Sequence, residues 1–288
     1  MRLRTRCTAA TSLLLGVMLA IGGVPGTATA DTGPAPLRQA HAHNDYEHPR
    51  PLHDALDHGF TSVEADIWLV DGRLLVAHDL ADVDPSRTLR SLYLDPLDEV
   101  AKKNGGSVYP GDRGPFQLLV DVKSEAEVTY AALDKELKRY PKLVTHWRHG
   151  REKTRAVTAV VSGNRAFDLM ARQKVRYAGY DGRLSDLASD APASLMPLVS
   201  DNWTTHFAWN GDGPIPADQR EKLRTIVDTA HAKGYRLRFW ETPDTAGPAR
   251  TAVWTELRDA GVDHLNTDDL AGLQDFLRQD SSRLGAGP

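Results

Sequence analysis

Two histidines and two carboxylates lie near the amino terminus at spacings that suit chemistry on one face of a strand. His41 and His43 are two residues apart, and so are Glu64 and Asp66. Because side chains alternate across a β-strand, residues two apart project to the same side. Two neighbouring carboxylates on an interior face repel each other unless a cation or a proton lies between them. We therefore expect Glu64 and Asp66 to bind a cation.

Asp121 adds a third carboxylate, near the end of the apolar run 116–122. Three carboxylates with open coordination positions suit hard cations that prefer oxygen ligands. We predict that Glu64, Asp66 and Asp121 bind one divalent cation, Mg²⁺ or Ca²⁺. The alternative interpretation is a carboxylate pair that Lys123 and arginines neutralise. We also expect removal of Glu64 to stabilise the metal-free protein, because it relieves like-charge repulsion.

A histidine pair beside a cation indicates proton transfer. One imidazole can take a proton from an attacking hydroxyl, and the other can donate a proton to the leaving oxygen. A metal ion would neutralise phosphate oxygens in the transition state. His78 is one candidate, and either His41 or His43 is the other, since both share a face. Lys123 is a further candidate contact to phosphate.

The elements that must position these residues alternate between apolar, β-rich runs and amphipathic helical runs. This alternation, repeated about eight times within residues 31–280, predicts an α/β fold with a single (β/α)8 TIM-type barrel. The candidate residues fall at carboxyl ends of strands, where such barrels hold their catalytic groups. The predicted strands are 37–43, 61–69, 116–122, 156–162, 175–179, 196–200, 235–240 and 262–266, with a short extension at 74–78, and a last helix is predicted over 270–278.

The two ends of the chain are predicted to lie outside this barrel. Residues 1–30 combine a basic start, a short apolar run and an Ala-Thr-Ala cleavage site, which predicts a cleaved signal peptide and a secreted protein. An uncleaved anchor is the alternative. Cys7, the only cysteine, would leave with this segment, which removes disulfides and thiol chemistry from the mature chain. Residues 281–288 are predicted to be a disordered tail.

Charge and hydropathy narrow the range of partners. The net charge is −4, and no basic run is present, so the chain is a poor candidate for nucleic-acid binding. After the first segment no apolar stretch is long enough to span a membrane. We expect a monomer that acts on a small-molecule or lipid phosphodiester.

The stretch 41–79 resembles the glycerophosphodiester phosphodiesterase and phosphatidylinositol-specific phospholipase C superfamily. The shared order is a strand-end His, then Glu-x-Asp, then His-Asp, and it is met by His43, Glu64, Asp66 and His78-Asp79. The resemblance continues through Leu119-Val120-Asp121-Val122-Lys123, Arg238-Phe239-Trp240-Glu241 and the segment 261–268. It implies a TIM barrel, a divalent cation on the acidic cluster, and a histidine pair as general base and acid.

The resemblance also guides the choice of residues. It favours His43 over His41 as the catalytic partner of His78, because Asn44 follows His43 as in phospholipase C-like members. We predict four contacts to substrate or phosphate: His41, Asn44, Lys123 and Trp240. The His-Arg-Gly and Pro-Glu-Asn motifs of the glycerophosphodiesterases are absent. His-x-His-Asn-Asp-Tyr with Glu-Ala-Asp-Ile-Trp looks closest to a branch that includes fungal altered-inheritance-of-mitochondria-type proteins.

Two other functions fit part of the pattern. His41-x-His43 is the metal signature of amidohydrolase-type barrels, but those enzymes need further histidines on strands five and six, and 175–179 and 196–200 carry none. A non-catalytic barrel that binds a sugar or a lipid headgroup is the second alternative, since late aromatic residues such as Trp240 could stack on a ligand. Magnesium or calcium dependence on a phosphodiester would exclude the amidohydrolase alternative. The non-catalytic barrel predicts an unaltered ligand after long incubation with metal.

Overall fold

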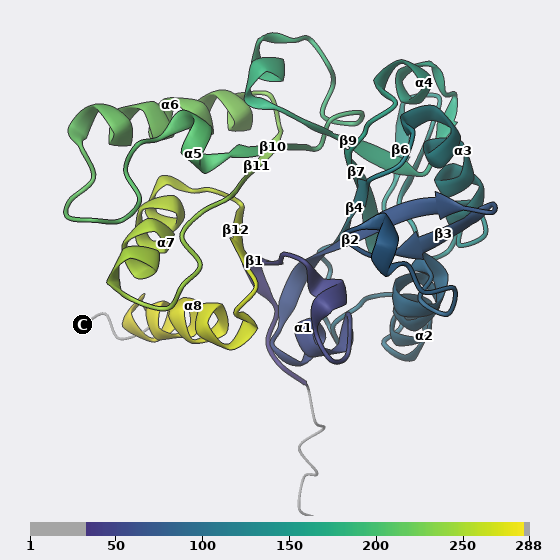
Figure 1. Cartoon of the computed structure of the whole chain (residues 1–288), viewed down its shortest axis with the longest axis horizontal. Coiled ribbons are helices and arrows are strands. Elements are labelled where there is room, and N and C mark those ends of the chain that lie inside the picture. Colours follow the sequence, from purple (N-terminus) through teal and green to yellow (C-terminus); the bar gives the residue numbers. More distant parts are fainter. Residues whose placement is uncertain (1–32, 285–288) are drawn as a thin grey trace, which may run out of the picture. The chain divides into compact units, whose positions relative to one another are not determined.

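The barrel is closed by its first strand. The structure, a computed structural model, describes residues 33–284, with side chains described as far as Gln279. β1 pairs with β2 on one side and with β12 on the other, so the parallel strands form a ring with the helices outside it (Figure 1). The prediction of a (β/α)8 TIM-type barrel is confirmed. The barrel strands are β1 (Leu37–Ala42), β2 (Phe60–Val70), β4 (Phe116–Val122), β7 (Val157–Gly163), β9 (Ala178–Gly182), β10 (Leu198–Asn202), β11 (Arg236–Trp240) and β12 (His264–Thr267).

Helices occupy most of the connections between barrel strands. None of the described helices is both long enough and apolar enough to cross a membrane. α8 runs to Leu284 and so continues past residue 281, where a disordered tail was expected. Residues 285–288 and the predicted signal peptide lie outside the described residues. The helices are α1 (His53–Asp57), α2 (Asp95–Lys103), α3 (Ala126–Leu137), α4 (Phe167–Arg172), α5 (Trp203–His206), α6 (Ala217–Ala232), α7 (Pro248–Ala260) and α8 (Leu270–Leu284), with one-turn helices at Asp45–Glu47, Leu80–Asp82, Arg90–Leu94 and Leu184–Ala188.

Two additions to the barrel modify its rim. β3 (Arg73–Val76) folds back antiparallel on β2 and delivers residue 78 to the barrel mouth. A small antiparallel sheet, which the sequence pattern did not predict, joins β5 (His146–Arg148), β6 (Arg151–Lys153) and β8 (Val175–Arg176). The expected fifth strand at 175–179 is therefore wrong in position. Its first residues form β8, and the barrel strand β9 extends to Gly182, because buried hydrogen bonds outweigh the poor strand propensity of Asp181.

The inside of the barrel is apolar in one layer and polar on both sides of it. Leu119, Val160 and Leu198 form a cluster of their own, fully buried and separate from the main core between strands and helices. Two residues earlier along β4 lies Gln117, and two residues later lies Asp121. Since residues two apart share a face, the apolar layer has polar groups on both sides along the barrel axis.

Candidate active site

The three predicted metal ligands meet at the carboxyl ends of β2 and β4. Asp66 lies opposite Asp121 in the parallel ladder, and Glu64 precedes Asp66 on the same face. One oxygen from each of the three carboxylates lies within 4.8 Å of the others. Glu64 is 5% exposed and Asp66 is 1% exposed. The structure therefore brings together the residues predicted to bind a cation.

Two cationic side chains contact this cluster. Arg238 Nη2 donates to Glu64 Oε2 at 2.6 Å, and both side chains are almost fully buried. Lys123 Nζ lies 3.0 Å from Asp66 Oδ2 and 3.2 Å from Asp121 Oδ1. Burial alone would raise the pKa of Glu64, but the charge of Arg238 and the contact with His41 together outweigh burial and hold that pKa well below its ordinary value. The negative charge of Glu64 is thus balanced by the positive charge of Arg238.

The excess negative charge lies on the other two carboxylates, which share one ammonium group. Burial, followed by the charge of Glu64, raises the pKa of Asp121 to about 6 and also raises the pKa of Asp66. This distribution reverses the expectation that removing Glu64 stabilises the metal-free protein. That change would leave Arg238 buried without its counter-charge, which costs more than the carboxylate repulsion that the change relieves.

The donor set fits a hard divalent cation. All three groups are carboxylates, and Asp66 Oδ1 is buried without a hydrogen-bond partner in the described part of the chain. A buried carboxylate oxygen without a partner carries a desolvation cost that a bound cation would remove. Lys123 and Arg238 satisfy part of the cluster, as the alternative interpretation expected, but they leave this oxygen free.

His41 lies beneath Glu64 and does not reach the barrel mouth. It is 0% exposed, its Nε2 lies 3.3 Å from Glu64 Oε2, and its Nδ1 lies 2.7 Å from Ser62 Oγ. Gln117 Nε2 donates to the same Ser62 hydroxyl at 2.9 Å. Burial and the charge of Arg238 lower the pKa of His41 to about 3, so the ring is neutral. His41 was predicted to contact the substrate; in the structure both of its ring nitrogens are engaged by protein groups and the side chain is fully buried.

His43 is held at one ring nitrogen. Its Nδ1 lies 2.9 Å from Asp268 Oδ1 and 3.0 Å from the side-chain amide of Asn44. Nε2 has no protein partner within hydrogen-bonding distance in the described part of the chain. Burial alone would lower the pKa of His43, but the hydrogen bond with Asp268 and the charge of Glu64 outweigh burial and raise it. A carboxylate on Nδ1 fixes the tautomer with a lone pair on Nε2.

His78 reaches the same mouth from the loop after β3. Its side chain is 56% exposed, and its Nδ1 lies 3.0 Å from Asp66 Oδ2 and 3.3 Å from the Tyr46 hydroxyl. The Trp68 indole donates to the His78 carbonyl oxygen at 3.2 Å and fixes this loop to β2. Both predicted catalytic histidines therefore hold Nδ1 on the protein side.

The remaining predicted contacts divide into two groups. Lys123 and Trp240 are partly exposed, as a substrate contact requires. Asn44 instead joins protein groups: besides His43, its amide oxygen lies 2.9 Å from the Tyr46 hydroxyl, which donates to Asp66 Oδ2 at 2.7 Å. Its backbone is left-handed, with φ 45°. Both polar atoms of the Asn44 side chain therefore lie beside protein groups.

Several residues of the site were not predicted as such. Three such residues, Arg238, Tyr46 and Asp268, contact the predicted residues, and their only sequence signal was membership in the quoted motifs. A second buried anion, Asp181, accepts hydrogen bonds from Ser162, Ser200 and Arg183 on the other side of the barrel interior. Burial raises the pKa of Asp181. Asp181 belongs to β9 but lies beyond the end of the predicted strand 175–179. The sequence pattern therefore did not place it in the barrel interior.

Comparisons with known proteins identify the family of this chain. Residues 28–181 match the family described as AIM6-like phosphodiesterase domain, and residues 236–271 match the glycerophosphoryl diester phosphodiesterase family. Altered inheritance of mitochondria protein 6 from Eremothecium gossypii is 31% identical, over 83% of this chain and 69% of that protein. Its homolog from Arthroderma benhamiae is 30% identical, over 88% and 87%.

Among solved structures, a glycerophosphoryl diester phosphodiesterase from Parabacteroides distasonis aligns with a TM-score of 0.49 and 14% identity, covering 88% of each chain. The sequence resemblance described above is confirmed by the family matches and by the fungal relatives. The chain belongs to the AIM6-like phosphodiesterase domain family, within the wider group of glycerophosphoryl diester phosphodiesterase-like proteins.

Proposed function

We propose that this protein is a metal-dependent phosphoric diester hydrolase whose chemistry takes place at the carboxyl end of the barrel. One observation carries the proposal: two histidines flank the carboxylate cluster, and each holds Nδ1 against an acidic side chain while Nε2 stays free of protein partners among the described residues. That arrangement is the one required of a general base and a general acid acting on either side of a phosphoryl group.

His43 is the proposed base. The Asp268 carboxylate accepts the Nδ1 proton and stabilises the imidazolium that forms when Nε2 takes a proton from the attacking hydroxyl. The side-chain amide of Asn44 also lies beside Nδ1, at 3.0 Å. His78 is the proposed acid, since its exposed ring can donate a proton from Nε2 to the leaving oxygen while Asp66 and Tyr46 hold its orientation.

Glu64, Asp66 and Asp121 would hold the divalent cation, Mg²⁺ or Ca²⁺. When bound, the cation supplies neutralisation of the phosphoryl oxygens and of the charge that develops on them. Lys123 lies against two of the same carboxylates and is placed to contact a phosphoryl oxygen with its ammonium group. Arg238 and His41 keep Glu64 ionised and oriented from below.

The substrate proposed is a small-molecule or lipid phosphodiester, consistent with the family, and Trp240 is a candidate to stack on its organic part. Export through the predicted signal peptide is part of the same proposal. Intact-mass measurement of protein recovered from the culture medium of the native host tests that part. A mass that retains residues 1–30 would contradict cleavage.

Phosphorus NMR of a panel of diesters tests the activity. The purified chain is incubated with glycerophosphodiesters, phospholipids and lysophospholipids, with added Mg²⁺ or Ca²⁺ and in parallel with EDTA. We expect turnover of at least one diester that EDTA abolishes and Mg²⁺ or Ca²⁺ restores. Full activity in EDTA would refute the claim that hydrolysis depends on a metal ion. Unaltered diesters throughout would favour the non-catalytic barrel, and zinc-dependent amide hydrolysis would favour the amidohydrolase alternative.

A further inference from the structure

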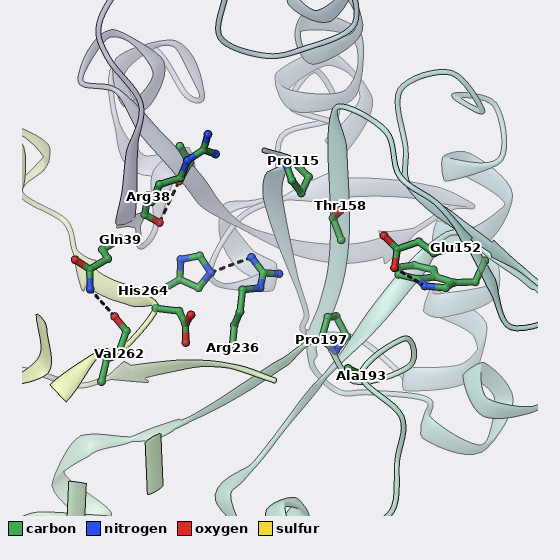
Figure 2. A pocket seen from close by; sticks show the side chains of 14 residues that line it. Arg38, Gln39, Pro115, Glu152, Thr158, Ala193, Pro197, Arg236, Val262 and His264 are labelled. Atoms are coloured by element: carbon green, nitrogen blue, oxygen red, sulfur yellow. Dashed lines mark hydrogen bonds between the residues drawn. The ribbon is translucent and has the colours of Figure 1, made fainter. Parts of the chain in front are cut away.

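A second cavity lies at the opposite end of the barrel from the proposed active site. Its volume is about 440 Å³, and its lining residues come from the amino-terminal ends of the strands, among them Gln39, Thr61, Thr158 and Arg236. This volume falls in the range of sites for small molecules. Figure 2 shows Arg236 and His264 side by side in this cavity, with Pro115 and Pro197 on its wall.

Arg236 is the cation of this cavity that lacks a counter-ion. No carboxylate in the described part of the chain forms an ion pair with its guanidinium. The one side-chain partner is His264 Nε2, 3.3 Å from Arg236 Nη1. Burial, followed by the charge of Arg236, lowers the pKa of His264 well below its ordinary value, so the ring is a neutral acceptor. The histidine therefore orients the guanidinium without cancelling its charge.

The other ionised groups around the cavity each have a hydrogen-bond or ion-pair partner other than Arg236. Arg38 forms an ion pair with Asp112. Glu152 accepts hydrogen bonds from Trp147 Nε1 and from the Thr154 hydroxyl. Asp263 contacts His231 at 2.9 Å and accepts from the Leu237 backbone N–H at 2.8 Å. Asp263 favours the charged form of Arg236 only through space, and burial lowers the pKa of that guanidinium.

We propose that this cavity binds a small organic anion, with its phosphate or carboxylate oxygens on the Arg236 guanidinium and its apolar part against Pro115 and Pro197. Arginine stays cationic even when buried, so an unpaired guanidinium in a partly apolar cavity carries a desolvation cost that an oxyanion would offset. The planar donor fork of arginine matches phosphate and carboxylate oxygens. The site is separate from the catalytic mouth because the layer of Leu119, Val160 and Leu198 lies between them.

Isothermal titration of the full-length chain with inorganic phosphate, in EDTA, tests this site, with acetate in a parallel titration to distinguish the two oxyanion classes. We expect saturable binding of at least one of them. Arg236→Gln should weaken that binding at least about tenfold, since a charged hydrogen bond contributes about 1.5–3 kcal/mol. Arg38→Gln is the matched control on the same rim and should change the affinity by less than about twofold.

A variant at the other barrel end separates this site from the active site. Lys123→Met should leave the titrated binding unchanged. Binding that is lost in Lys123→Met and kept in Arg236→Gln would overturn the proposal, as would the absence of saturable binding of either anion to the wild-type chain. If Arg236→Gln does not fold, Arg236→Lys decides: a weakened but saturable titration supports the site, and wild-type affinity in that variant refutes a role for the guanidinium fork.

Discussion

At the scale of single residues, charge compensation decides what each carboxylate of the site contributes. Glu64 is matched by Arg238 at 2.6 Å, whereas Asp66 and Asp121 share the ammonium of Lys123. Neutralising a buried ion that has a counter-charge leaves the counter-charge unpaired and destabilises the protein. Neutralising a buried ion that is in excess relieves repulsion and does not. The same three side chains, equivalent as candidate metal ligands, therefore differ in what they do for stability.

Glu64→Gln is expected to destabilise the metal-free protein by about 3–5 kcal/mol, because it leaves the Arg238 charge buried and unpaired. Asp121→Asn, the matched change on the neighbouring strand, should be neutral or stabilising, because it lowers the excess negative charge beside Asp66. Urea unfolding in EDTA measures both. Equal losses of unfolding free energy in the two variants would show that Arg238 does not distinguish Glu64 from Asp121 in this way.

His43→Ala and His78→Ala are each expected to lower kcat by at least about 10², the usual contribution of a general acid or base. Both imidazoles lie at the barrel mouth, so the free energy of unfolding should change by less than about 1 kcal/mol. Steady-state kinetics on the diester found by phosphorus NMR, together with urea unfolding, provide the measurement. His53→Ala, on the exposed side of α1, is the control. Retained kcat in both variants would remove the histidine pair from the mechanism.

At the scale of elements, the ends of strands and the loops after them set the geometry of the site. Gly163 ends β7 with φ 66°, and a Cβ there would overlap Asp121 Oδ1 and the Val122 carbonyl oxygen. Glycine is therefore required both for the backbone conformation and for the position of the carboxylate. Gly72, in the turn between β2 and β3, has φ 75° with nothing within 4 Å of such a Cβ.

Gly163→Ala should weaken Mg²⁺ or Ca²⁺ binding by at least about tenfold and cost about 1–3 kcal/mol of stability, because Asp121 must move away from the other ligands. Gly72→Ala bears the same backbone penalty without the overlap and should leave cation affinity unchanged. Calorimetric titration of both variants with the cation compares them. Wild-type affinity in Gly163→Ala would place the cation elsewhere.

The loop after β1 is anchored by a buried acid outside the carboxylate cluster. Asp45 is 0% exposed, and its Oδ2 accepts from the Leu52 backbone N–H at 2.6 Å and from the Tyr93 hydroxyl at 2.9 Å. Oδ1 has no partner in the described part of the chain. Burial raises the pKa of Asp45 to about 7, against the opposing effect of these hydrogen bonds. Folding therefore favours the protonated carboxyl.

This raised pKa gives the stability a defined pH dependence. The contribution of the protonated Asp45 carboxyl to the free energy of unfolding is complete below about pH 4 and is lost as the pH rises through about 7. Asp45→Asn imitates the protonated form, so its stability relative to wild type should rise by roughly 2–3 kcal/mol between pH 5 and pH 8. Urea unfolding at both pH values measures the difference, with the exposed Asp57→Asn as control. A difference that is the same at both pH values would contradict the assignment.

At the scale of the whole molecule, the barrel interior is a thin apolar layer between two polar ends. Leu119, Val160 and Leu198 fill that layer. On one side lie the carboxylates of the proposed active site, and on the other lies the cavity with Arg236. The layer therefore supports both sites while keeping them apart.

Leu198→Ala should cost about 2–5 kcal/mol, because neighbouring strands of a closed barrel cannot collapse into the space that is left. Leu80→Ala, whose side chain is 52% exposed, is the control and should stay within about 0.5 kcal/mol. Urea unfolding of the two variants is the measurement. Equal costs would mean that the inner layer does not stabilise the barrel.

Much of the barrel and of its carboxylate cluster follows from sequence patterns alone. Period-two spacing places Glu64 beside Asp66, and the strand–helix rhythm puts Asp121 on the adjacent strand, because parallel strands in a barrel end at the same edge. These are local or nearest-neighbour relations, which a single sequence contains. The same rhythm misplaced β9 and missed the small sheet, since burial and hydrogen bonding there outweigh intrinsic propensity.

Contacts between residues far apart in the sequence were decided only by the tertiary structure. Arg238 reaches Glu64 and Asp268 reaches His43 from strands far away in the chain, and no spacing rule connects them. Spacing left His41 and His43 equivalent as well. Burial separates them: one is a neutral ring enclosed beneath Glu64, and the other is a partly exposed ring at the mouth. Period two determines which side of a strand a residue faces, and closure of the barrel determines what it meets there.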